Sequence, residues 1–421
     1  MANTTTYQCP NCNGRLSFDG SSGKLTCEFC GSQFTPEEVE RLFAEKQAKA
    51  DAQAAGDRAE QVATQAGAGA AAGGAHAAHA DHGDHAAQGV TAAQASTTSA
   101  TRVEQAHAAP TGDPIQDYLA QSKWDSSETD NLRAFNCPAC GAQLLVDQVT
   151  AVTSCPYCGN NAVVPGQLSD VLKPDYVIPF KLDRNAAIAA LKQYYNGKRL
   201  LPNSFTANNH IEEIQGVYVP FWLYSGTADG DVTYNGRNVR TWSDSENMYT
   251  ETDHYLLTRQ GTMSFRGVPV DGSTKMPDAH MDAIEPFDYS EMVPFSVAYL
   301  PGYITDRYDL DVKQCDSRAR NRVENTCIEE MGTTVGGFME TDVQSAYADV
   351  NWTNIAYALL PVWMLHTKWN GEDYLFAMNG QTGKLIGDLP IDSGKVTKRF
   401  LMMFLPIMLL IGLIIFFVFG F

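Results

Sequence analysis

Apolar and polar residues alternate with two different periods in the second half of the chain. Residues 183–195 place alanine, leucine and tyrosine at helical spacing behind an aspartate, which predicts a capped amphipathic helix. A longer helix is predicted over 311–331, where arginine and glutamate take the exposed positions. The segments 217–224, 357–368 and 373–378 are short and strongly apolar, which is typical of buried strands.

Turn signals between these segments predict antiparallel hairpins. Asn235-Gly236 and Asn370-Gly371 are the dipeptides favoured in tight hairpin turns. Residues 249–258 and 262–270 have the composition of two further strands. We therefore expect an α+β body that is rich in antiparallel sheet, between residues 171 and 394.

The body carries a weak internal repeat. A Pro-Phe pair at 179–180, and again at 294–295, precedes a predicted helix and then a strand that contains Pro-x-Trp. This order predicts two related α+β halves with Trp222 and Trp363 at equivalent core positions. The fold class is thus α+β, with a two-fold repeat inside the body.

The last residues of the sequence have a different character. Residues 400–421 contain no charged side chain, and as a helix these 22 residues would extend about 33 Å, against about 30 Å for the hydrocarbon core of a bilayer. Lys395, Lys398 and Arg399 precede them, and the positive-inside rule places such residues in the cytoplasm. We expect a tail-anchored, single-pass protein of the cell inner membrane with most of its chain cytoplasmic.

Eight cysteines form two copies of one motif. In each copy two CxxC pairs are separated by fourteen residues, which is the spacing of a tetrahedral four-thiolate Zn²⁺ site. All-thiolate coordination leaves no open position, so we expect two structural zinc ions rather than catalytic ones. A redox CxxC pair and disulfide bonds are less favoured alternatives. The predicted ligands are Cys9, Cys12, Cys27, Cys30, Cys137, Cys140, Cys155 and Cys158.

These segments give a division of the chain into parts. The stretch between the two motifs is rich in alanine, glycine and histidine and has too few large apolar residues to form a core. Its histidines fit either a weak metal-binding tract or a polar linker, and we favour the linker; they are His76, His79, His82 and His85. The predicted parts are zinc ribbon 1 (1–35), a helical spacer (36–65), a disordered linker (66–112), zinc ribbon 2 with a preceding helix (113–170), the α+β body (171–394) and a transmembrane helix (400–421).

Charge argues against nucleic acid as a partner. The chain has a formal net charge of −19 and a pI of about 4.8. Ribbon 1 carries two basic and two acidic residues between its cysteines, and ribbon 2 carries only Asp147. A protein that binds phosphates needs a lysine and arginine patch, and neither ribbon has one.

No catalytic motif stands out. The sequence lacks GxSxG, a P-loop, HExxH and a GxGxxG that opens a helix after a strand. We therefore expect no enzymatic activity. Cys315 and Cys327 fall within the predicted long helix and are interpreted as ordinary reduced cysteines.

Several phrases together resemble a known family. They are the residues 137–140, 155–160, 173–180, 217–222 and 376–384. This set resembles bacterial membrane proteins described as transcription factor IIB-type (TFIIB-type) zinc ribbon-containing proteins, and the likeness extends from about residue 120 to the end. The resemblance implies a membrane-bound zinc ribbon protein, with links in some relatives to membrane-stress systems that contain phage-shock-protein-A-like or flotillin-like partners. Ribbon 1 and the linker are not features of that family.

The resulting hypothesis is a tail-anchored scaffold or recruitment platform that binds protein partners at the inner membrane, with a role in membrane stress. Two alternatives stay open. One is a membrane-tethered nucleic-acid-binding or transcription-related protein, which would need a basic face. The other is an enzyme with a site between the two halves of the body, which would need a buried cluster of ionisable groups.

Overall fold

The computed structural model has the mixed α+β fold that the sequence predicts. Helix is present at 36–46, inside the predicted spacer. The predicted linker and its histidine tract lie outside the described residues, except for the last linker residue. The structure describes residues 8–46, 48–49, 112–121, 124, 132–147, 154–160, 164–166, 172–206, 211 and 213–420.

Ribbon 1 is a small antiparallel sheet of three strands, β1 (Leu16–Asp19), β2 (Lys24–Cys27) and β3 (Gln33–Phe34). The helix at 36–46 follows directly and begins with a capping box. The Thr35 hydroxyl accepts a hydrogen bond from the Glu38 N–H, and the Glu38 carboxylate accepts one from the Thr35 N–H.

A second sheet contains 11 strands from the described part of the chain. Its central pair is the long antiparallel pair of β8 and β12, and β9 and β13 are hairpin partners of these two strands. The main order is β10 (Val293–Pro294), β7 (Tyr176–Val177), β12 (Glu340–Trp369), β8 (Gln215–Ser243), β11 (Ile304–Asp306), β5 (Gln143–Asp147), β4 (Leu132–Asn136) and β6 (Val164–Gly166). The remaining strands are β9 (Met248–Asp271), β13 (Glu372–Asn379) and β14 (Leu385–Gly387).

Most of the remaining helices of the described part of the chain lie in the connections between strands, and α8 follows the last strand. They are α2 (Pro114–Gln121), α4 (Arg184–Tyr195), α6 (Asp278–Ile284), α7 (Val312–Thr333) and α8 (Ser393–Phe419), with short 3₁₀ turns η2 (Asn203–Thr206), η3 (Tyr289–Glu291) and η4 (Val297–Tyr299). Asp183 and Asp311 cap α4 and α7 with their side chains, as the sequence indicates.

The body has an internal repeat around the β8 and β12 pair. β7 runs parallel to β12 and leads through α4 into β8, while β11 runs parallel to β8 and leads through α7 into β12. The strand that leads into α7 is therefore β11 and not the Pro-Phe segment at 294–295. That segment contributes β10, an outer strand paired with β7, where a proline is tolerated because no further strand needs its N–H.

Two strand predictions are wrong in the same region. β8 continues without a turn through Asn235-Gly236, and β9 is one strand where two were expected. The chain reverses instead after Asp244, whose N–H donates to the carbonyl of Asn247. The lack of a side chain at Gly236 allows Phe338 to pack against the strand, because a Cβ there would lie 2.9 Å from the ring of Phe338. The other turn is confirmed: Asn370 and Gly371 have positive φ and join β12 to β13.

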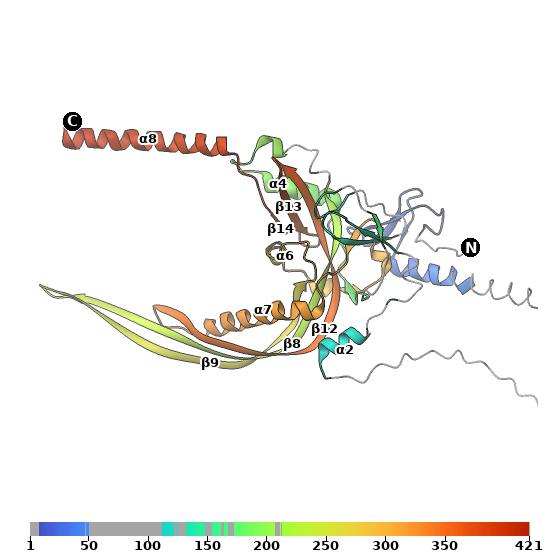
Figure 1. The fold of residues 1–421 in the computed structure, drawn as a ribbon, viewed down its shortest axis with the longest axis horizontal. Helices are drawn as coiled ribbons and strands as arrows, with labels where there is room; N and C mark the ends of the chain where they lie inside the picture. The colour runs from blue at the N-terminus through green and yellow to red at the C-terminus, as the bar shows by residue number, and fades with distance from the viewer. Residues whose placement is uncertain are drawn as a thin grey trace, which may run out of the picture. The chain divides into compact units, whose positions relative to one another are not determined.

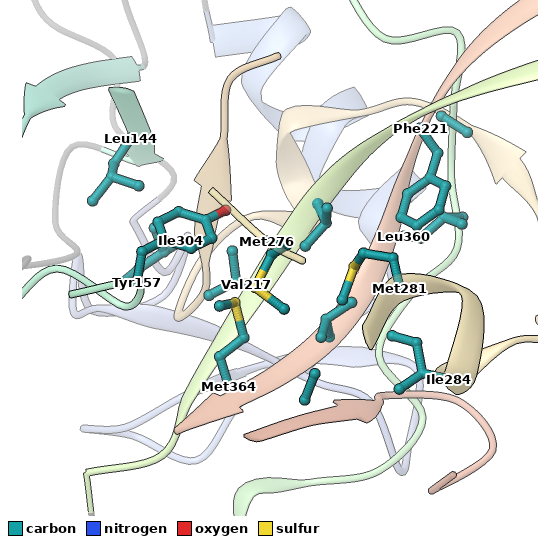
Figure 2. Packing of buried hydrophobic residues seen from close by; sticks show 14 of the residues in the cluster. Leu144, Tyr157, Val217, Phe221, Met276, Met281, Ile284, Ile304, Leu360 and Met364 are labelled. Carbon is teal, nitrogen blue, oxygen red and sulfur yellow. The ribbon is translucent and has the colours of Figure 1, made fainter. Parts of the chain in front are cut away.

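Ribbon 2 shares the hydrophobic core of the body. Its strand β5 is hydrogen-bonded to β11, so the ribbon continues the large sheet. Figure 2 shows the shared core, in which Leu144 and Tyr157 of the ribbon belong to the same buried cluster as Val217 of β8 and Met281 of α6.

One helix in the described part of the chain is long and apolar enough to cross a membrane. The span 393–415 in α8 has a mean hydropathy of 2.1, and none of its most apolar window is buried against other residues. Its exposure together with its apolar composition is consistent with single-pass membrane anchoring.

Candidate metal centres

The four cysteines of ribbon 2 converge on one point. Sγ of Cys137 lies 3.6 Å from Sγ of Cys158, and Sγ of Cys140 lies 3.6 Å from Sγ of Cys155. All four sulfur atoms lie within 4.8 Å of one another. A tetrahedral ion with metal–sulfur bonds of about 2.3 Å needs sulfur atoms about 3.8 Å apart. The spacing therefore fits a Zn²⁺ ion and is too wide for disulfide bonds, which are about 2.05 Å long.

Ribbon 1 repeats this arrangement. The Cys9 and Cys30 sulfurs are 3.5 Å apart, as are those of Cys12 and Cys27. The structure thus brings together each set of four ligands that the sequence predicts.

Local turns position all eight sulfur atoms. In ribbon 2 the N–H of Cys137 donates to the carbonyl of Ala142, and the N–H of Gly141 donates back to the carbonyl of Cys137, both at 2.8 Å. The other three CxxC pairs have the same two backbone hydrogen bonds. The residue after each second cysteine has a positive φ, which suits glycine or asparagine; these residues are Asn13, Gly31, Gly141 and Gly159.

In ribbon 2 the surroundings of Cys137 favour its ionised form, whereas those of Cys140 disfavour ionisation. Burial opposes ionisation of Cys137, but hydrogen bonds from the Cys140 and Ala139 N–H groups outweigh it and lower its pKa to about 7. Burial raises the pKa of Cys140 to about 11. A divalent cation compensates the charge of several thiolates held so close together, which is the chemistry of a closed four-cysteine zinc centre.

The second CxxC turn has a different environment in each ribbon. Phe29 of ribbon 1 is 79% exposed, whereas the equivalent Tyr157 of ribbon 2 is 7% exposed and belongs to the shared core. Ribbon 2 is therefore built into the body on this side, while ribbon 1 presents an aromatic side chain to solvent.

Residues distant in sequence support ribbon 2, and sequence reasoning missed them. His366 of β12 lies against Gly159, and its Nε2 is 3.1 Å from Oδ1 of Asp373. Burial lowers the pKa of His366, which favours the neutral ring. Asp306 of β11 is buried, and it lies opposite Leu144 of the ribbon strand β5 in the antiparallel pairing of β11 with β5. No local motif marks these positions, because they meet the ribbon only after the sheet has formed.

A cavity of about 420 Å³ lies beside ribbon 2. It is lined by Ser154, Cys155, Pro156, Gly159, Glu213, Gln215, Met364 and His366. The Gln215 side chain donates to the Ser154 hydroxyl across this space at 2.7 Å. The lining contains no activated serine or lysine, and Cys155 belongs to the four-cysteine cluster that could hold a metal ion.

Comparison with known proteins finds a distant relative. The chain is 28% identical over 316 residues to the "Uncharacterized protein YdjG" of Bacillus subtilis (strain 168). The aligned region covers 63% of this chain and 93% of that protein. No protein-family model and no solved structure matches the chain. The likeness covers nearly the whole of the relative and brings no activity with it.

Proposed function

We propose that this protein is a membrane-anchored zinc ribbon scaffold that recruits protein partners to the inner face of the membrane. The observation that carries the proposal is the presence, in one chain, of two closed four-cysteine centres and one exposed apolar helix. A closed thiolate centre stabilises a small rigid surface and supplies no open coordination position for chemistry.

Ribbon 1 is the better candidate for the recruiting surface. Ribbon 2 has its second CxxC turn buried in the body, so this part of its surface is already occupied. Ribbon 1 exposes Phe29, and exposed aromatic residues are frequent anchors in protein interfaces. The balanced charge around Phe29 favours a protein partner over nucleic acid.

The orientation of the anchor belongs to the proposal. Lys395, Lys398 and Arg399 lie at the start of α8, ahead of the uncharged part of the helix. The positive-inside rule places this end of the helix in the cytoplasm, together with the body and the ribbons. A reducing cytoplasm also suits thiolate ligands.

The family and its cellular role are proposals as well. Membership in the TFIIB-type zinc ribbon-containing membrane proteins rests on the sequence resemblance. That resemblance points to membrane stress and to phage-shock-protein-A-like or flotillin-like partners.

A cross-linked pull-down from membranes tests the scaffold. The full chain is compared with Phe29→Ala and with a variant that has serine at all four cysteines of ribbon 1. Val164→Ala, at an exposed position on β6, is the matched control. We expect the control to retain the membrane-protein partners and both ribbon 1 variants to lose them. Capture of nucleic acid or polymerase subunits by the full chain would contradict the proposal.

A further inference from the structure

Strand β9 forms one edge of a long three-stranded arm. The arm consists of residues 226–243 of β8, 248–266 of β9 and 340–352 of β12, with β8 in the middle. Figure 1 shows the three strands curving together alongside α7, with β8 and β9 continuing past the end of that helix. In the described part of the chain β9 pairs with β8 alone, so its other side has no strand neighbour.

This edge has few of the features that usually protect a sheet edge against pairing. Natural sheet edges are commonly blocked by lysine, proline or very short strands. β9 is 24 residues long, contains no lysine and has its one proline at Pro269, beyond the arm. Tyr255 and Leu256, near the middle of the arm, are 43% and 68% exposed. Such an edge is suited to accept another strand.

The charges on β9 are ordered along its length. Glu251 and Asp253 lie in the first half of the strand, and Arg259 and Arg266 lie in the second half. Two β9 strands in antiparallel orientation, with Leu256 of each opposite the other, would place Asp253 of each copy opposite Arg259 of its partner. Parallel pairing would place like charges together, which is unfavourable for directly opposed residues.

We propose that β9 pairs antiparallel with β9 of a second copy of this chain, with Leu256 at the two-fold axis. In this register Leu256 faces Leu256 of the second copy, Tyr255 faces Leu257, and Asp253 faces Arg259. The two most exposed apolar residues in the middle of the strand become covered. The contact is isologous and closed, so it yields a dimer rather than a filament.

The opposite edge of the arm does not offer the same contact. Between 340 and 352, β12 carries Glu340, Asp342 and Asp349 and no lysine or arginine. Two copies of this edge would bring acidic residues together without a compensating cation. The ordered charges therefore single out β9.

Disulfide trapping tests the register in the full chain in its native membranes. Opposed residues in an antiparallel pair have Cα atoms about 4.5–5.5 Å apart, within reach of a disulfide. Leu256→Cys should therefore give a covalent dimer under mild oxidation. His254→Cys is the matched control, because it lies on the same face and its two copies would be about 13 Å apart. The unmodified chain gives the background.

We expect cross-linking of Leu256→Cys to exceed that of His254→Cys at least tenfold. Equal cross-linking of the two variants, or none at 256 above background, would overturn the proposal. Leu256→Lys adds a test without oxidation, since it opposes two ammonium groups at the axis. It should lower the dimer fraction of nanodisc-embedded protein severalfold with an unchanged far-UV circular dichroism spectrum. A monomeric unmodified chain in that measurement would also reject the dimer.

Discussion

Trp222 and Trp363 hold equivalent positions in the two halves of the body. Trp222 donates its indole N–H to the carbonyl of Leu310 at 2.9 Å, and Trp363 donates to Leu182 at 3.0 Å. Each acceptor directly precedes the aspartate that caps a helix, α7 for Trp222 and α4 for Trp363. A tryptophan from each half of the body therefore holds in place the start of the helix that belongs to the other half.

Removing either indole N–H should destabilise the body. Trp222→Phe and Trp363→Phe each leave a carbonyl without its partner, at a cost of about 1–3 kcal/mol. Chemical denaturation followed by circular dichroism measures the free energy of unfolding. Trp242→Phe is the control, because Trp242 is half exposed on the arm and should change stability by no more than about 0.5 kcal/mol. Equal losses at all three positions would contradict the role of these two bonds.

Single cysteine substitutions should separate the two metal centres. Cys27→Ser and Cys155→Ser should each lower the zinc content from two ions to one per chain, measured by elemental analysis of the purified protein. Cys315→Ser lies outside both clusters and should leave two ions. Cys155→Ser should also lower the melting temperature more than Cys27→Ser, because Cys155 belongs to the shared core. Two ions in either ribbon variant would refute the ligand assignment.

Two glycines with the same backbone requirement should respond differently to alanine. Gly141 and Gly159 have φ of 74° and 66°, so each alanine costs about 1–2 kcal/mol from the backbone alone. A Cβ at Gly141 meets nothing within 4 Å, whereas one at Gly159 lies 2.7 Å from Nδ1 of His366. Gly159→Ala should therefore weaken zinc retention against a competing chelator more than Gly141→Ala. Equal retention would show that His366 moves aside freely.

The burial of the Asp271 carboxyl group should make stability depend on pH. Burial raises the pKa of Asp271 to about 6, although Arg318 lies 2.5 Å away and favours the carboxylate. A raised carboxyl pKa means that stability falls as pH rises from about 4 through the folded pKa. Arg318→Met should raise that pKa further, and should cost about 3–5 kcal/mol at pH 8.

The loss should be smaller at pH 5, where Asp271 is protonated in the variant. Unfolding curves at the two pH values provide the measurement. Arg318 also pairs with Asp278 and Asp282 of α6, so part of the loss will not vary with pH. Lys368→Met, at an exposed pair with Asp373, should show little loss at either pH.

A charge in the middle of α8 should impair anchoring. Leu409→Arg adds about 2.5–3.5 kcal/mol to the cost of membrane insertion at the centre of a span. Val396→Arg lies beside the basic residues at the start of the helix and should insert normally. Resistance to alkaline extraction from membranes reports the difference. Full resistance of Leu409→Arg would argue against a transmembrane position for this residue.

Features that depend on near neighbours can be predicted from the order of residues alone. Each CxxC pair and the glycine or asparagine after it form a turn of a few residues, so the cysteines and their spacing identify both four-cysteine clusters. The caps at Asp183 and Asp311 and the uncharged length of α8 are local in the same sense. Their geometry is set by backbone sterics and short-range hydrogen bonds, which the order of residues encodes directly.

The way in which these parts join depends on contacts between residues that are distant in sequence. Asn235-Gly236 has the composition of a turn, yet it lies inside β8 because Phe338, a hundred residues later, packs on Gly236. The strand that precedes α7 is β11, which pairs with β8 on one side and with β5 of ribbon 2 on the other. These outcomes depend on pairings between distant strands and on which side chains they bury. A local pattern cannot specify them, because the partner is absent from any short window of the sequence.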